Sequence, residues 1–302
     1  MKKLFALIFV VLLAVGMFAG CGAEAESHDL SSTNLPSETE TKIQEEVTQI
    51  ETVPADVVTI EKKVIYDTDG VTVTVTGIEE GWTGTEIKLL VENATDRNIA
   101  VSGDNIIVNG VTMSAYLYID VAAGKKTNST MSIYSDNLEA AGIERIATLN
   151  AKDAHIVDTD SYETLAAAPF EIVTSIGSDY VQEIDDSGDI LFESNGVSVI
   201  AKIITDSLFG EEVMLLVKNT SNEDITVEAE NISVNGFTVD GWMYDTVYAG
   251  TVRFCEMDIY SSSLEENGIT EVEDVCFTIN LINPNTYSRI AKSDEIQVVV
   301  NP

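Results

Sequence analysis

The stretch NIIVNG occupies residues 105–110, and the closely similar NISVNG occupies residues 231–236. In each stretch an isoleucine and a valine, two positions apart, precede an Asn-Gly pair. A period of two is typical of a β-strand with one buried face, and Asn-Gly favours the positive φ angles of a two-residue type I′ turn. Each stretch therefore predicts the first strand and the turn of a β-hairpin, with VTMSAYLYI or FTVDGWMYD as the returning strand.

The hairpin belongs to a longer internal repeat. Residues 64–158 align with residues 190–284 without a gap, and 31 of these 95 positions are identical. A unit of this length is typical of a whole domain and is too long for a solenoid repeat. Alternating strand patterns and Asn/Asp/Gly-rich turns recur through both copies. We therefore expect an all-β protein with two tandem antiparallel β-sandwiches, at residues 59–176 and 177–302.

One short helix is expected in each copy. Asp136-x-x-Glu139 and Ser262-x-x-Glu265 have the spacing of a capping box, in which two side chains bond the first free backbone N–H groups of a helix. Gly142 and Gly268 follow at the position where a glycine can end the helix.

The N-terminal segment is expected to direct export. Lys2 and Lys3 precede an uncharged apolar run, which is the layout of a secretory signal peptide. The alternative is a transmembrane anchor, but no basic stop follows the run. The tetrapeptide Phe18-Ala19-Gly20-Cys21 resembles the lipobox of bacterial lipoproteins. This resemblance implies that a signal peptide at residues 1–20 is removed, and that acyl chains on Cys21 hold the protein on the outer face of the bacterial cell membrane.

An acidic tether is expected between the anchor and the first domain. Residues 21–58 are rich in Glu, Ser and Thr and contain no aromatic residue. Such a segment buries too little apolar surface to fold alone, so we expect it to be disordered.

Several shared motifs link the two copies to a known family. They are the strands LLVEN and LLVKN, the Asn-Ile-x-Val-Asn-Gly hairpin and the Ser-x-x-Leu-Glu-x-x-Gly-Ile corner. With the lipobox, they resemble the paired immunoglobulin-like domains of unknown function in lipoproteins of Clostridia-like bacteria. The resemblance implies an immunoglobulin-like sandwich for each copy and brings no catalytic residues with it.

The net charge limits the partners of the protein. The chain has 51 Asp and Glu against 16 Lys and Arg, which gives a formal charge of −35. Nucleic acids and anionic lipid headgroups are bound through basic patches. Nucleic-acid binding is therefore not expected, and membrane contact is expected only through the lipid on Cys21.

Residues for catalysis or for cofactor binding do not form a recognisable set. The two histidines, His28 and His155, are far apart in sequence, and no known nucleophile, zinc or phosphate motif occurs. The runs DTDG and DDSGD have closely spaced oxygen atoms, but neither completes a calcium loop. We expect no metal, no cofactor and no enzymatic activity. Strand parity directs Cys255 inward and Cys276 outward, which favours two free thiols.

A candidate ligand site follows from strand parity after the Asn-Gly turns. On each returning strand, every second residue should point into the core. These residues are Val111, Met113, Ala115, Leu117 and Ile119 in copy one, and Phe237, Val239, Gly241 and Met243 in copy two. The opposite face then carries Thr112, Ser114, Tyr116 and Tyr118 in copy one, and Thr238, Asp240, Trp242 and Tyr244 in copy two. Tyr116, Tyr118, Trp242 and Tyr244 form a candidate stacking platform for a sugar or an extended peptide; the alternative is a packing role within the sheet.

These features together predict a binding protein at the cell surface. The expected function is that of a non-enzymatic binding or interaction module that recognises an envelope glycan or a surface protein. One alternative is a structural spacer or accessory subunit of an envelope complex. The other is a carboxylate-based hydrolase: acidic residues are so abundant that the sequence neither identifies nor excludes a catalytic pair of carboxylates.

Overall fold

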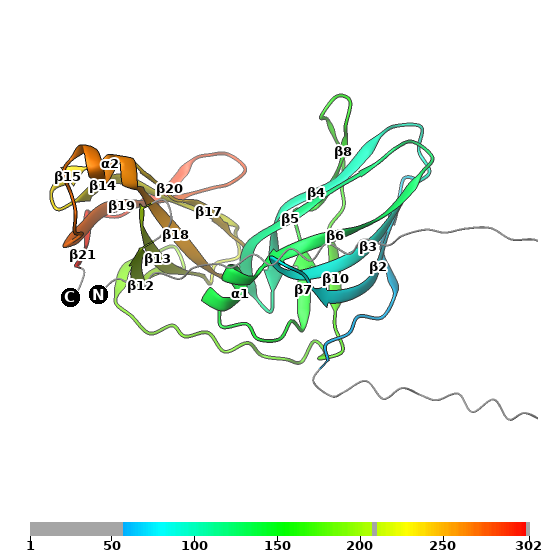
Figure 1. The fold of residues 1–302 in the computed structure, drawn as a ribbon, viewed down its shortest axis with the longest axis horizontal. Coiled ribbons are helices and arrows are strands. Elements are labelled where there is room, and N and C mark those ends of the chain that lie inside the picture. The colour runs from blue at the N-terminus through cyan, green and yellow to red at the C-terminus, as the bar shows by residue number, and fades with distance from the viewer. Residues whose placement is uncertain (1–56, 207–209, 300–302) are drawn as a thin grey trace, which may run out of the picture. The chain divides into compact units, whose positions relative to one another are not determined.

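The repeated strand patterns form antiparallel sheets in the computed structural model, which describes residues 57–206 and 210–299 (Figure 1). The expected signal peptide, Cys21 and all but the end of the expected tether lie outside these residues. Both copies belong to one unit, Val53–Pro302. In the described ranges, no helix has the length and apolar character needed to cross a membrane.

The described part of copy one contains ten strands and one helix. They are β1 (Lys63–Thr68), β2 (Val71–Glu80), β3 (Gly84–Asn93), β4 (Ile99–Val108), β5 (Val111–Val121), β6 (Lys126–Tyr134), α1 (Ser135–Ala140), β7 (Thr148–Ala151), β8 (His155–Asp158), β9 (Thr164–Ala167) and β10 (Phe170–Val173). The strands β1-β2-β3-β6-β5 are neighbours in that order, in a sheet that continues from β5 into copy two. Strand β5 also pairs with β4, which pairs in turn with β7 and β8, while β9 pairs with β8 and β10 with β7.

Copy two repeats this order with one interruption. Its elements are β11 (Ile190–Ser194), β12 (Val197–Asp206), β13 (Gly210–Asn219), β14 (Ile225–Val234), β15 (Phe237–Thr238), β16 (Gly241–Trp242), β17 (Tyr244–Val247), β18 (Val252–Tyr260), α2 (Ser261–Glu266), β19 (Asp274–Ile282), β20 (Arg289–Lys292) and β21 (Ile296–Val299). One set of strands runs β11-β12-β13-β18. The other is centred on β14, which pairs with β15, β17 and β19, and β19 pairs with β20 and β21.

Each copy has its own apolar cluster. The first lies within residues 71–172 and the second within residues 197–296. Both are built mainly from Val, Ile and Leu, and Phe277 is the one aromatic among the largest fully buried side chains of the described residues. The β-branched residues suit a pleated, half-buried surface. The chain is therefore mostly β, as the sequence predicted.

The opening hairpins have the predicted turn. Asn109 and Gly110 adopt φ angles of 51° and 87°, and Asn235 and Gly236 adopt 51° and 80°. Both residues of a type I′ turn require positive φ. Val108 pairs with Val111 across the first turn, so the register is the one that the Asn-Gly prediction implies.

Each turn asparagine has a second role that the sequence did not reveal. Asn109 Oδ1 accepts hydrogen bonds from the backbone of Ala147 and Thr148 at 2.8 and 3.0 Å, and its Nδ2 donates to Arg145 O at 2.8 Å. In copy two, Asn235 makes the equivalent three bonds to the segment Glu271–Asp274. The Asn side chain therefore ties the hairpin to the segment that follows the helix.

The expected capping boxes are wrong, whereas the expected glycine ends are correct. Both helices follow a strand directly, so their N-cap residues are Tyr134 and Tyr260, and neither makes a side-chain cap. The expected cap residues, Asp136 and Ser262, lie within the first turn. At the other end of α1, Gly142 has φ 62° and its N–H donates to Glu139 O. Ile143 N donates to Leu138 O, which completes a Schellman motif.

The returning strand of copy two differs from the expected single strand. FTVDGWMYD breaks into β15, β16 and β17, and β16 pairs with β18, whereas β15 and β17 pair with β14. Val239 and Met243 are buried as expected, but Phe237 is 51% exposed, so its predicted inward position is wrong. The physical reason is that β15 ends after two residues, and its side chains therefore do not continue the core-facing row.

The two described cysteines are free. Cys255 is buried, as parity predicted, and Cys276 is partly exposed. Burial raises the pKa of the Cys255 thiol well above its ordinary value, so this thiol stays protonated and unreactive at neutral pH.

Candidate functional site: an aromatic surface beside a polar pocket

Aromatic side chains lie mostly on the surface of this protein. Both tryptophans are exposed, and so are seven tyrosines: Tyr116, Tyr118, Tyr134, Tyr162, Tyr180, Tyr260 and Tyr287. An aromatic side chain usually contributes a large area to a core, but these cores are mainly aliphatic, with Phe170 in the first and Phe277 in the second. The exposed rings therefore offer apolar surface to other molecules. Positions where several rings lie close together are candidate binding sites.

The Trp242 and Tyr244 rings gather at the interrupted strand. Their centroids are 5.9 Å apart and the ring planes are tilted by 31°. The Trp242 side chain is 57% exposed, and Tyr244 is half-buried. The prediction that both face outward from the sheet therefore describes Trp242 well and Tyr244 in part.

Gly241 positions Trp242. Strand β16 pairs with β18 through Gly241 opposite Ile259 and Trp242 opposite Asp258. A Cβ atom at residue 241 would lie 2.5 Å from Asp258 O, so any larger residue would push the two strands apart. Gly241 thus sets the close approach that places the indole on the same face as Asp258.

A polar pocket of about 190 Å³ adjoins the two rings. Residues of both copies line the pocket. Copy one contributes Ser114 and Asn137, and copy two contributes Trp242, Tyr244, Asp245, Arg253, Phe254, Glu256 and Asp258. Larger hollows of about 790 and 430 Å³ border the beginning of the described chain, at residues 57–63.

Arg253 forms the floor of the polar pocket. Its Nη2 lies 2.6 Å from Asp245 Oδ1, and the side chains of Arg253 and Asp245 are 8% and 19% exposed. The same guanidinium donates to Asn105 Oδ1 at 2.7 Å and to Ser114 Oγ at 2.9 Å, both in copy one. Burial raises the pKa of Asp245, and the Arg253 charge opposes that rise. With its donors engaged in this way, Arg253 joins the copies and is not an anion-binding group.

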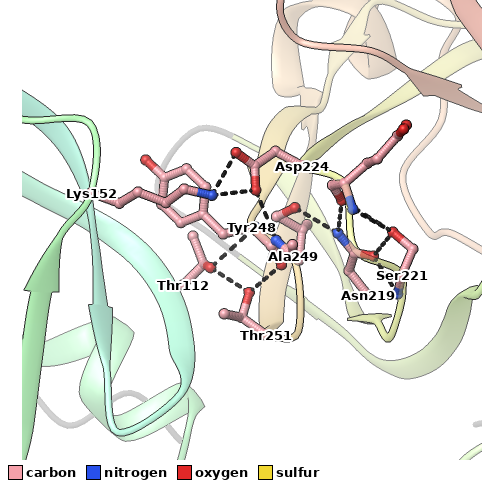
Figure 2. Close-up of polar contacts among 10 residues, drawn as sticks. Thr112, Lys152, Asn219, Ser221, Asp224, Tyr248, Ala249 and Thr251 are labelled. Carbon is pink, nitrogen blue, oxygen red and sulfur yellow. Dashed lines mark hydrogen bonds and ion pairs between the residues drawn. The ribbon is translucent and has the colours of Figure 1, made fainter.

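Further contacts join the two copies, and we call them the seam (Figure 2). Thr112 Oγ1 and Thr251 Oγ1 are 2.7 Å apart and buried. Val252 N donates to Gly110 O at 3.3 Å, and Val252 pairs in parallel with Val111. Thr112 was predicted on the exposed face; that prediction is wrong because copy two covers it.

A salt bridge lies at the edge of the seam. Lys152 Nζ lies 2.6 and 2.7 Å from the two Asp224 oxygens, and it also lies 5.0 Å from the centroid of the Tyr248 ring. Asp224 Oδ1 accepts a second bond from Ala249 N at 2.9 Å, which fixes the carboxylate (Figure 2). Burial and the neighbouring Asp153 carboxylate raise the pKa of Tyr248, so its hydroxyl stays protonated.

Tyr116 and Tyr118 of copy one form a second exposed group. They are 56% and 39% exposed on β5, as parity predicted. Partial burial and the Asp120 carboxylate raise the pKa of Tyr118, and Tyr162 and Tyr116 contribute to the rise. Tyr116 and Tyr118 lie two positions apart on β5 and therefore share one face of the sheet. Tyr116 pairs with Ser132, the counterpart of the Trp242–Asp258 pair in copy two.

Arg253 and Tyr162 were not among the residues predicted from the sequence. Arg253 shares parity with the inward-facing Cys255 and Met257 on β18. A charged residue in a core-facing row indicates a buried ion pair, and this signal was present in the sequence. Tyr162 has no such signal, because it follows the last strand of the gap-free alignment.

The lining of the polar pocket has groups that can bind a ligand. The pocket has ring surfaces, hydroxyl and amide groups, and carboxylates, all of which can stack on or hydrogen-bond to a ligand. The described residues include no group of three or more His, Cys, Asp or Glu placed to hold a metal ion. His155 lies on β8, and its Nδ1 lies 2.9 Å from Asp153 O.

Comparisons with known proteins identify no family. No protein-family model matches the chain, and no curated protein matches it. Among solved structures, the chain is similar to a conserved domain protein from Bacillus anthracis, with a TM-score of 0.27 and 12% sequence identity. That similarity covers 80% of this chain and 92% of the other.

Proposed function

We propose that this protein is a non-enzymatic binding module, built from two tandem immunoglobulin-like domains and held at the bacterial cell surface by a lipid on Cys21. The observation that carries the binding function is the exposure of both tryptophans and of seven tyrosines around mainly aliphatic cores. Exposing so much aromatic surface favours association with a partner, because these rings are the side chains that contribute most at binding sites. The immunoglobulin-like assignment is supported by the repeated antiparallel strand order.

Trp242 and Tyr244 form the proposed centre of ligand contact. Their tilted rings lie beside a pocket with hydrogen-bonding groups from both copies. A ligand of mixed character, such as an envelope glycan or a surface protein segment, would use the rings for stacking and the polar groups for orientation. The charge of −35 disfavours nucleic acids and other polyanions as ligands.

Fluorescence of a single tryptophan tests the binding site. Trp82 and Trp242 are the two tryptophans, so Trp82→Phe leaves Trp242 as the reporter in the otherwise complete protein. We expect isolated cell envelope to change its emission and to bind the protein. Trp242→Ala with Tyr244→Ala should weaken binding about 100-fold, because each lost stacking anchor costs about 1–2 kcal/mol.

A matched control uses Trp82, which is fully exposed elsewhere in copy one. Trp82→Ala should leave envelope binding unchanged. If the Trp242/Tyr244 variant bound as well as the wild type and melted at a lower temperature, the rings would be packing residues. A spacer role would then be favoured over a binding role.

Anchoring is tested separately. Cys21→Ser removes the only expected acylation site, and the acidic body has little affinity of its own for a membrane. We expect the variant to lose fatty-acid label in cells and to appear in the medium. Label retained on the Cys21→Ser protein would contradict lipid attachment at this residue.

A further inference from the structure

The two copies share a hairpin tip that the gap-free alignment does not contain. In copy one, the tip lies between β8 and β9 and includes Tyr162; in copy two, it lies between β19 and β20 and includes Tyr287. The two tyrosines are 125 positions apart, one fewer than the repeat spacing, which is why a fixed offset misses them. Tyr162 is 79% exposed and Tyr287 is 75% exposed.

The backbone of the two tips is held by the same four hydrogen bonds. In tip one, Asp158 Oδ1 accepts from Asp160 N and Ser161 N, at 2.9 and 3.0 Å. Tyr162 N donates to Asp158 O at 2.8 Å, and Asp158 N donates to Glu163 O at 2.9 Å. In tip two, Asn283 takes the place of Asp158, and the four bonds are between 2.9 and 3.0 Å. The two tips therefore have the same hydrogen-bonded backbone.

Both tyrosines occupy a backbone conformation that their ring makes unfavourable. Tyr162 has φ 60° and Tyr287 has φ 56°. Bulky residues rarely adopt a positive φ, whereas Gly and Asn adopt it readily. The fold would thus be served better by Asn at these positions. A tyrosine at both strained positions is explained if the exposed ring itself contacts a ligand.

The tips share an aromatic ring and hydroxyl groups but not their charge. Asp158, Asp160 and Glu163 of tip one correspond to Asn283, Asn285 and Ser288 of tip two. Ser161 and Thr286, which precede the tyrosines, both carry a hydroxyl. A ligand that binds both tips would therefore contact the groups that the tips share, through stacking on the ring and through hydrogen bonds to uncharged groups. A pyranose ring presents C–H groups on one face and hydroxyls around its edge, which matches this chemistry.

We propose that Tyr162 and Tyr287 are two equivalent contact points for an uncharged stretch of an envelope polysaccharide, so that one protein holds a sugar polymer at two places. This inference rests on the proposed binding function and names its ligand class. Copy one also exposes the rings of Tyr116 and Tyr118 on β5. Two weak contacts on one polymer bind together far more tightly than either does alone.

The test uses Tyr→Asn variants of the complete protein. Tyr162→Asn and Tyr287→Asn remove the ring but suit the positive φ, so both should melt at or above the wild-type temperature. Binding to isolated cell envelope should weaken about 10-fold in each single variant and about 100-fold or more in the double variant. Tyr162→Phe keeps the ring and should bind nearly as well as the wild type.

The chemical class of the ligand is tested on the same envelope. Binding should survive protease treatment of the envelope and should be lost after periodate oxidation, which cleaves vicinal diols of sugars. Loss after protease treatment alone would show a protein partner and overturn the inference. If the double Tyr→Asn variant bound normally while the Trp242/Tyr244 variant did not, the tips would be excluded and the proposed function would stand. No binding by the wild type would contradict both.

Discussion

Individual side chains decide where the two copies meet and what they expose. Parity on the returning strand of copy one correctly placed Met113, Ala115 and Leu117 inside and Tyr116 and Tyr118 outside. It failed at Thr112, which is 1% exposed because another copy of the same domain covers it. A pattern of period two reports which face of a sheet a residue is on, but it does not report what packs against that face.

Arg253 offers the first prediction at the scale of a residue. Arg253→Met keeps the apolar stem but leaves the buried Asp245 without its partner, and it also removes the bonds to Asn105 and Ser114. We expect a loss of about 3 kcal/mol in the free energy of unfolding, measured by chemical denaturation. Adding Asp245→Asn should recover part of it, because the unpaired buried charge is then absent. An unchanged stability for Arg253→Met would show that the cluster contributes nothing.

Asp158 carries a prediction about pH. The N–H groups of Ser161 and Asp160 hydrogen-bond its carboxylate and, with Arg97, lower its pKa below the ordinary 3.8. A lowered folded pKa stabilises the protein above pH 3.8, and this contribution is lost as the pH falls through the folded value. A carbon NMR titration should therefore give a midpoint below 3.8. Asp158→Asn, which copies Asn283, should remove this part of the pH dependence of stability. A titration midpoint of Asp158 above 3.8 in the wild-type protein would refute the prediction.

At the scale of elements, the hairpins were predictable and the strand interruption was not. Asn-Gly dictates its own turn, because both residues accept positive φ. In contrast, FTVDGWMYD has the alternation of a single strand, yet it breaks at Val239 and Asp240, because β16 pairs with β18 whereas β15 pairs with β14. The glycine that permits this close contact is visible in the sequence, but its partner, Asp258 O, is visible only in the fold.

The turn asparagines give a prediction at this scale. Asn109→Gly keeps the positive φ of the turn and removes the three side-chain bonds to Arg145, Ala147 and Thr148. It also removes the bond that Asn109 Nδ2 donates to Gln182 Oε1 at 3.2 Å. We expect unfolding to become easier by about 1–3 kcal/mol, because backbone groups lose their partners. Asn235→Gly should behave alike in copy two. If Asn109→Gly were neutral in thermal denaturation, the asparagine would serve only the turn, as the sequence alone indicated.

At the scale of the whole molecule, an internal duplication has been built into one compact unit. The repeat and its approximate limits could be read from the sequence, since 31 of 95 aligned positions are identical. The seam could not be read from the sequence, because a residue that is buried in the seam has an aligned counterpart in the other copy that is exposed. Thr112 is buried against Thr251, whereas its counterpart Thr238 is exposed. The same sequence pattern therefore has two structural outcomes.

This asymmetry provides a direct test of coupling between the copies. Thr112→Ala removes the hydroxyl that bonds Thr251 Oγ1 at 2.7 Å and accepts from Tyr248 N at 3.4 Å. A substitution in copy one should therefore lower amide hydrogen-exchange protection in β17 and β18 of copy two, by about 1–2 kcal/mol. The matched control is Thr238→Ala, which should leave protection unchanged throughout. Reduced protection confined to the strands of copy one would show that the copies are independent, and the pocket lined by both would then lack a fixed geometry.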